Sequence, residues 1–183
     1  MPNYRRPQCA GATYFITQVT YQRIPWLCTP AGRKALREAI LHVSIKHPFF
    51  IDAFVLLPEH FHCILTLPDN EDNFSMRLRL IKTYVTKHYK QEISVEQGVS
   101  ISRQKRLESN LWQRRFWEHL IRDEQDFASH CDYIHYNPVK HGLSKSPRDW
   151  QFSTIHRFIH HGVYPSDWGE NEEIVMKEGI GGE

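Results

Sequence analysis

Four segments of the chain have the apolar and aromatic composition of β-strands. The first alternates apolar and polar residues and is rich in β-branched and aromatic residues, which predicts a strand directly. The four segments are residues 12–22, 49–58, 61–68 and 111–122. Only Glu59 and His60 separate the second segment from the third, so we expect these two strands to form a hairpin.

Three other segments carry apolar residues at the spacing of an α-helix. These segments are residues 29–47, 72–91 and 123–138. The first opens with Thr29 and Pro30, which suit a helix N-terminus. The third opens with acidic residues, which favour the positive end of a helix, and we expect it to stop before Pro138.

The resulting order, β-α-β-β-α-β-α, predicts an α+β fold of the split β-α-β, ferredoxin-like type. We expect an antiparallel sheet with helices on one face and an added helix, followed by an extension that wraps around the core from residue 139 onward. A length of 183 residues suits one domain. We place that domain at residues 1–166. Residues 167–183 form an acidic C-terminal tail with six acids and one lysine.

Composition narrows the class of protein further. The four cysteines form no C-x-x-C pair and no zinc-finger spacing. No apolar run reaches the ~20 residues that a membrane span needs, and the first residues lack a signal-peptide pattern. We therefore expect a cytoplasmic protein without membrane contact, associated with the nucleoid when bound to DNA.

The stretch "LLPEHFHCILTLP" places His60 and His62 two residues apart in an otherwise apolar strand. Residues two apart on a strand point to the same face, so both imidazoles project together while Phe61 and Cys63 face the other side. Imidazole is the commonest metal ligand, and two of them can supply adjacent ligands. The alternative is a pair of polar residues on a solvated strand face.

The stretch "CDYIHYNPVKHGL" places Tyr133 and Asn137 four residues apart, on one face of a helix. Taken alone, this pattern favours a core tyrosine and an asparagine that caps the helix before Pro138. Taken with the histidine pair, it also fits a phenol and an amide carbonyl that share one site.

Basic residues gather in the middle of the chain. Between Phe74 and Arg122 there are 11 bases and 4 acids, a net charge of +7, although the whole chain carries only +2. Basic clustering with interleaved aromatic residues is typical of a nucleic-acid surface. For any single residue, a solvated helix face or a basic loop is an equally good explanation.

With these motifs the sequence resembles a known family, the REP-associated tyrosine transposases of the HUH endonuclease superfamily. In that superfamily's name, HUH stands for two histidines around a hydrophobic residue, here "HFH". REP stands for repetitive extragenic palindrome. The resemblance runs through nearly the whole chain, from "YRR" and "LPEHFHCILTLP" through "WQRRFWEHLIRDEQDF" and "DYIHYNPVKHGL" to "DWQFSTIHRFIHHGVYPSDW".

The resemblance implies roles for individual residues. Tyr133 would be the nucleophile, and His60, His62 and Asn137 would hold a divalent metal, either Mg²⁺ or Mn²⁺. Asparagine is shorter than the glutamine or glutamate that many relatives carry at the third position. The predicted DNA-binding residues are all basic: Arg5, Arg6, Arg77, Arg79, Lys82, Arg103, Lys105, Arg106, Arg114 and Arg115.

The function that follows is a metal-dependent endonuclease and strand transferase for single-stranded DNA. It would act on REP hairpins through a 5′-phosphotyrosine, as a monomer or a dimer. Two alternatives remain open at this stage. One is a DNA-hairpin-binding regulator that keeps the fold but does not cleave, and the other is an unrelated metal-dependent hydrolase that uses only the histidine pair. The acidic tail either competes with DNA for the basic surface or is a solvating bystander.

Overall fold

The computed structural model describes residues 9–93, 110–170, 174 and 180–181. Its strands and helices follow the predicted order. They are β1 (Thr13–Val19), α1 (Pro30–Lys46), β2 (Phe50–Leu56), β3 (His60–Thr66), α2 (Phe74–Ile93), β4 (Trp117–Leu120), α4 (Glu124–Lys140) and α5 (Ile155–His160), with one-turn 3-10 helices at Tyr21–Arg23 and Pro147–Asp149.

The four strands form one sheet in the order β2-β3-β1-β4, and every neighbouring pair is antiparallel. This order confirms the α+β fold with split β-α-β topology. The β2–β3 hairpin also forms, with a turn of residues 57–59, so that His60 is the first residue of β3. In the central β1–β3 pair, Thr17 lies opposite His62 and Val19 lies opposite His60.

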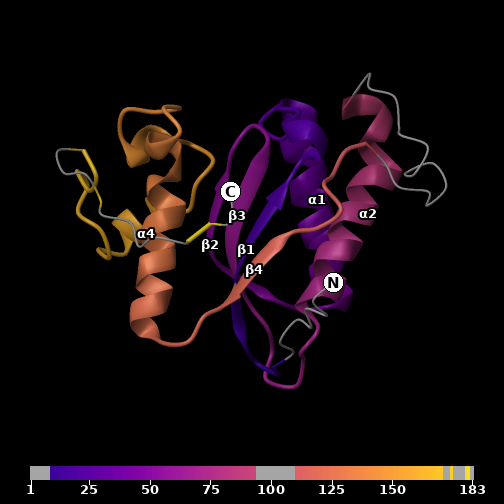
Figure 1. Cartoon of the computed structure of the whole chain (residues 1–183), viewed down its shortest axis with the longest axis horizontal. Coiled ribbons are helices and arrows are strands. Elements are labelled where there is room, and N and C mark those ends of the chain that lie inside the picture. Colours follow the sequence, from indigo (N-terminus) through magenta and orange to yellow (C-terminus); the bar gives the residue numbers. More distant parts are fainter. Residues whose placement is uncertain (1–8, 94–109, 171–173, 175–179, 182–183) are drawn as a thin grey trace, which may run out of the picture.

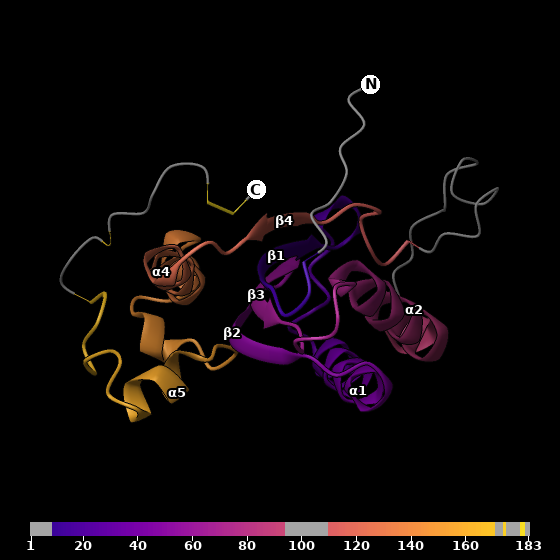
Figure 2. The same ribbon diagram turned by 90° about the horizontal axis from the view of Figure 1, so that it is seen from below.

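Helices cover both faces of the sheet (Figures 1 and 2). The two helices α1 and α2 pack side by side on one face, as predicted, over a core that includes Ile16, Phe61 and Leu65. The added helix α4 lies on the opposite face, where Ile134 packs with Phe15 and Ile64 of the sheet. Alternation along β3 therefore places His60, His62 and Ile64 on the α4 side.

Two predicted boundaries were wrong. The third predicted helix does not stop before Pro138, because α4 continues to Lys140 with the proline inside it. Proline removes one N–H and crowds the carbonyl of Ile134, but the following turn still closes, because the N–H of His141 donates to the carbonyl of Asn137 at 3.0 Å. The fourth strand is shorter than expected, and β4 spans only Trp117–Leu120. Before it, the carbonyls of Gln113 and Arg114 accept from Lys82 Nζ.

The C-terminal extension docks on the outer strand β2. Thr154 forms two backbone bonds of this contact, since its N–H donates to Phe54 O at 2.9 Å and its Oγ1 accepts from Phe54 N at 2.8 Å. Trp150 Nε1 donates to Leu56 O at 2.9 Å. The extension thus covers a sheet edge that would otherwise expose unpaired backbone groups. None of the described helices combines the length and the apolar character that a membrane span requires.

Candidate active site

The two histidines of β3 are fully buried and adjacent, with ring centroids 4.8 Å apart. Each ring is held through Nδ1. The nitrogen Nδ1 of His60 lies 3.1 Å from Glu59 Oε1, and that of His62 lies 2.8 Å from Thr17 Oγ1. Partners of this kind orient histidines that bind a metal.

The bond network around Thr17 determines which nitrogen of His62 carries the proton. The Thr17 hydroxyl donates its single hydrogen to the carbonyl of Gly181, at 2.6 Å. It therefore accepts from His62, whose Nδ1 must be protonated. The lone pair of His62 is then on Nε2, the atom that a metal would contact.

Helix α4 and its C-cap residue face the histidine pair with a stripe of residues spaced four apart: Tyr133, Asn137 and His141. The Tyr133 ring lies 5.2 Å from the His62 ring, and the His141 ring lies 5.3 Å from the His60 ring. Because Asn137 is one turn from each, it faces the space between the two contacts. The structure thus brings together the nucleophile and ligand candidates that the sequence indicated.

Asn137 provides an independent test of whether this site fits a metal. Its side chain is completely buried, yet neither its Oδ1 nor its Nδ2 has a hydrogen-bond partner among the described residues. A buried amide without partners costs about 1–3 kcal/mol. Two imidazoles and an amide oxygen form a donor set that Mn²⁺ accepts, and Mg²⁺ less readily because it prefers oxygen. The residues present therefore fit a divalent metal.

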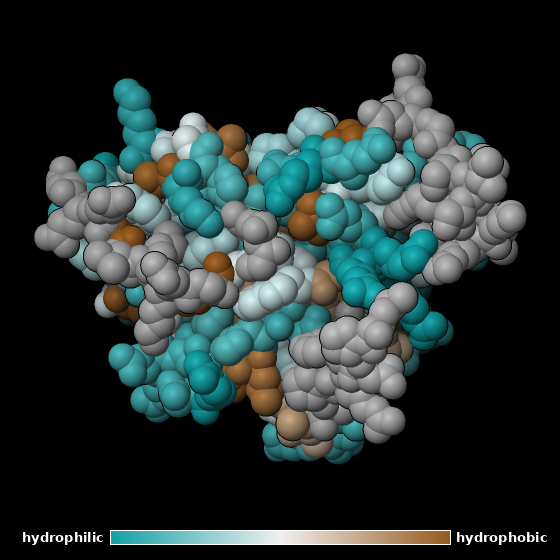
Figure 3. Space-filling model, viewed as in Figure 1, coloured by the Kyte–Doolittle hydropathy of each residue, from teal (hydrophilic) through white to brown (hydrophobic). Residues whose placement is uncertain are grey.

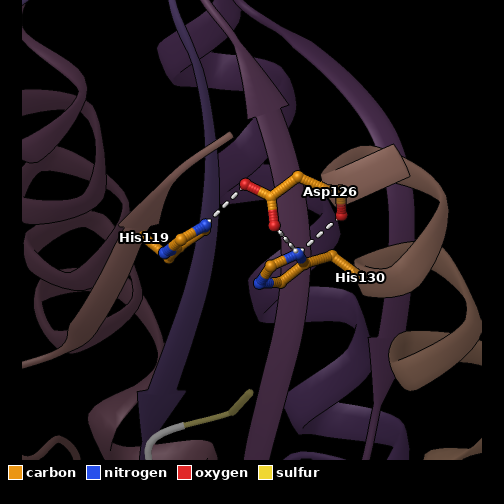
Figure 4. Close-up of side chains that lie close together, drawn as sticks. All are labelled: His119, Asp126 and His130. Atoms are coloured by element: carbon orange, nitrogen blue, oxygen red, sulfur yellow. Dashed lines mark hydrogen bonds and ion pairs between the residues drawn. The ribbon is translucent and has the colours of Figure 1, made fainter. Parts of the chain in front are cut away.

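A second group of potential ligands lies beside this site, formed by His119 of β4 and by Asp126 and His130 of α4 (Figure 4). The Asp126 carboxylate already accepts from His119 Nε2 at 2.8 Å and from Arg122 N and Nε at 3.1 and 3.2 Å. Burial opposes its ionisation, but hydrogen bonds from His119 and Arg122 lower the pKa of Asp126 to about 2. These hydrogen bonds and the positive charge of Arg122 indicate that Asp126 holds β4 and α4 together and does not bind a metal.

Tyr133 is covered by the end of the chain. The residue is 2% exposed, and a β-carbon built on Gly181 would clash with its hydroxyl oxygen. Figure 1 shows the yellow segment Ile180–Gly181 between α4 and the sheet, and Ile180 packs against the core there. The Ile180–Gly181 segment thus reaches the candidate nucleophile itself, whereas the sequence suggested either competition with DNA for the basic surface or a solvating bystander.

The predicted DNA-binding residues fall into four groups. Arg79, Arg114 and Arg115 are exposed, and the last two line a cavity of about 480 Å³ with Tyr21 and Gln113. Arg77 instead is buried, and its guanidinium bonds Pro48 O and Asn73 O, which leaves no surface for DNA. Lys82 is half-buried, and its Nζ donates to the backbone carbonyls of Gln113 and Arg114. The remaining candidates lie outside the described residues: Arg5, Arg6, Arg103, Lys105 and Arg106.

The surface on the side of the molecule shown in Figure 3 is mostly hydrophilic. On the face shown in Figure 3, hydrophilic residues predominate and hydrophobic residues are scattered in small groups. The described residues on this face form no single broad apolar patch of the kind that marks a protein interface.

Comparisons with known proteins decide the family. A REP-associated tyrosine transposase of Escherichia coli K12 is 44% identical to this chain over 168 residues, which are 92% of this chain and 91% of that protein. The chain belongs to the REP-associated tyrosine transposases. A Haemophilus influenzae protein provisionally named as a member is 41% identical over 180 residues, 98% of this chain and all of its own length. No protein-family model matches the chain.

A solved structure supports the same family and the same fold. A REP-associated tyrosine transposase bound to a REP hairpin matches this chain with a TM-score of 0.75 at 40% identity, covering 99% of this chain and 100% of that one. The prediction of a tyrosine transposase, and hence of a DNA nicking enzyme, is confirmed.

Several residues of the site were missed by the sequence reasoning. Lys140 and His141 continue the helical spacing that begins at Tyr133, so that spacing could have indicated them. Thr17 lies on a neighbouring strand and Gly181 lies 164 residues beyond it, so no local pattern connects either to His62.

Proposed function

We propose that this REP-associated tyrosine transposase cleaves and rejoins single-stranded DNA at REP hairpins, in a metal-dependent reaction that passes through a 5′-phosphotyrosine on Tyr133. The observation that carries the proposal is the convergence of Tyr133 with His62 and with the unsatisfied amide of Asn137. The solved relative bound to a REP hairpin supports the choice of substrate.

In this reaction the Tyr133 hydroxyl oxygen attacks the scissile phosphorus. A bond forms between that oxygen and phosphorus, and the bond from phosphorus to the 3′ oxygen breaks. The phenol loses one proton and the departing 3′ hydroxyl gains one, so the step is balanced overall. The metal, held by His60, His62 and Asn137, would withdraw charge from the phosphate oxygens.

The protein residues around the reacting groups have defined tasks. Thr17 and Glu59 hold the two imidazoles in position through their Nδ1 atoms. Tyr133 stores the energy of the broken phosphodiester as a covalent bond, which strand transfer requires. The exposed Arg79, Arg114 and Arg115 would neutralise DNA phosphates, and the hairpin would approach after the Gly181 segment leaves the tyrosine.

A covalent-adduct assay with labelled hairpin DNA tests the proposal. With Mn²⁺ present, DNA labelled at its 3′ end should give a labelled protein band on a denaturing gel, whereas DNA labelled at its 5′ end should give a free fragment. Tyr133→Phe should abolish the band and keep hairpin affinity, because only the nucleophilic oxygen is lost. Tyr136→Phe is the matched control, since this half-buried tyrosine packs on Trp168 at 6.3 Å.

The same assay separates the alternatives. An adduct that persists in Tyr133→Phe would assign the nucleophile to another residue. Cleavage without any adduct would indicate a hydrolase that activates water, and binding with neither cleavage nor adduct would indicate a regulator. Activity in EDTA equal to that in Mn²⁺ would refute the metal site.

A further inference from the structure

Lys140 lies beside the candidate nucleophile, although Tyr133 is in the middle of α4 and Lys140 is at its C-terminus. It is the last residue of α4 and follows Tyr133 by seven positions, which is about two turns and brings it to the same face. Its Nζ donates to the Tyr133 hydroxyl oxygen at 3.2 Å. The same Nζ lies 4.7 Å from the centre of the tyrosine ring.

The position of this ammonium relative to the approaching DNA is constrained by the chemistry. Tyr133 is buried while Lys140 is exposed, so the lysine connects the phenol to the solvent from which DNA approaches. A reacting phosphorus must come within about 3–3.5 Å of the attacking oxygen. Because Nζ is 3.2 Å from that oxygen, the non-bridging oxygens of the phosphate come within reach of the ammonium.

The phosphate carries negative charge that increases on its oxygens as the new bond forms. A metal held by β3 and Asn137 can reach one side of the phosphate, and the tyrosine occupies the line of attack. Lys140 is a described cation whose ammonium donates directly to the attacking atom. Preorganised cations at the point where charge develops are among the largest contributions to catalysis.

We propose that Lys140 is a catalytic residue that binds a non-bridging oxygen of the scissile phosphate and stabilises its charge during transfer to Tyr133. This inference rests on the proposed role of Tyr133 as nucleophile. The bond that forms joins the Tyr133 oxygen to phosphorus, and the bond that breaks releases the 3′ oxygen. Lys140 keeps all its protons throughout, and the proton lost by the phenol is matched by the one gained at the 3′ hydroxyl.

The simplest competing explanation is packing, since a lysine can rest on a tyrosine ring through cation–π attraction alone. The two explanations differ in what they predict for variants. A packing role would appear in thermal stability and would be independent of the charge on the DNA. A catalytic role would appear in the rate of adduct formation and would depend on that charge.

The test uses the full chain with Mn²⁺ and measures single-turnover adduct formation on a hairpin with an ordinary phosphate at the cleavage site. Lys140→Met should lower the rate about 100-fold, with hairpin affinity changed less than about fivefold, because one exposed charge contributes little to binding. Lys140→Arg should recover most of the rate, since it restores the positive charge. Lys145→Met, which removes another exposed lysine of the same region, is the control and should react as the unmodified chain does.

A second substrate makes the result decisive. A methylphosphonate at the cleavage site removes one negative oxygen from the phosphate. If Lys140 acts on that charge, the penalty of Lys140→Met should shrink to less than about tenfold on this DNA, as a thermodynamic cycle requires. An equal penalty on both DNAs, or a loss explained by a lower melting temperature, would overturn the catalytic role. Should Tyr133→Phe still form the adduct, the proposed nucleophile is wrong and not merely the lysine.

Discussion

The contact between Gly181 and Tyr133 leads to a sharp prediction, because a single methyl group should remove it. Gly181 adopts a positive φ of 112°, and a β-carbon at this position would clash with the tyrosine hydroxyl. Gly181→Ala should therefore displace the tail from the site. The chain would then lose the hydrogen bond from Thr17 and the packing of Ile180.

The size of the effect follows from these two contacts. One hydrogen bond contributes about 1 kcal/mol net. Partial burial of an isoleucine contributes about 1 kcal/mol more, and the entropy of ordering the tail opposes both. A closing free energy of about 1–2 kcal/mol keeps the tyrosine covered in most molecules. Since 1.4 kcal/mol corresponds to a factor of ten, Gly181→Ala should raise the rate of adduct formation about tenfold.

The assay compares single-turnover adduct formation and melting temperature for three variants and the unmodified chain. Gly162→Ala is the matched control, because Gly162 has a positive φ of 71° but no atom within 4 Å of a built β-carbon. A chain that ends after Glu170 should behave like Gly181→Ala, because it keeps the Trp168 stack on Tyr164 and the Arg148–Glu170 ion pair. If both Gly181→Ala and the shortened chain form the adduct at the wild-type rate, the hypothesis that the Gly181 segment closes the site is refuted.

Three further predictions concern single side chains. Asn137→Ala should slow adduct formation less than His62→Ala does, since water can replace an amide ligand. In EDTA the same substitution should raise the melting temperature, because it removes a buried amide without partners. A lower melting temperature in EDTA would contradict this. Asp126→Asn should cost about 2 kcal/mol of unfolding free energy at pH 7. The folded pKa of Asp126 is about 2 and its ordinary value is 3.8, so this stability is present above pH 4 and is lost as the pH falls through 2. Urea unfolding should therefore show a smaller difference in unfolding free energy between the variant and the unmodified chain at pH 3 than at pH 7. Arg115→Ala should lower the salt dependence of hairpin binding by about one phosphate contact, whereas Arg77→Ala should destabilise the fold and leave that salt dependence unchanged, which a salt titration of affinity would test.

The local geometry of the site follows from the sequence alone. A strand alternates with a period of two, so His60 and His62 had to share a face wherever β3 lay in the sheet. A helix repeats every 3.6 residues, so Tyr133 and Asn137 had to share a face whatever α4 packed against. The sequence also predicted the order of strands and helices, because the spacing of apolar residues differs between a strand and a helix and is a local property of each segment.

Only the tertiary structure decided how these faces meet and which side chains they bury. Arg77 is as basic as Arg79, yet packing against Pro48 and Asn73 takes it out of reach of DNA. The helix passes through Pro138, and Gly181 reaches Thr17 across 164 residues. Periodicity is a property of the backbone over a few residues, whereas these features depend on contacts between segments that are distant in sequence. The sequence therefore predicted the two halves of the site, and the packing of α4 on the sheet joined them and added Lys140 and the tail.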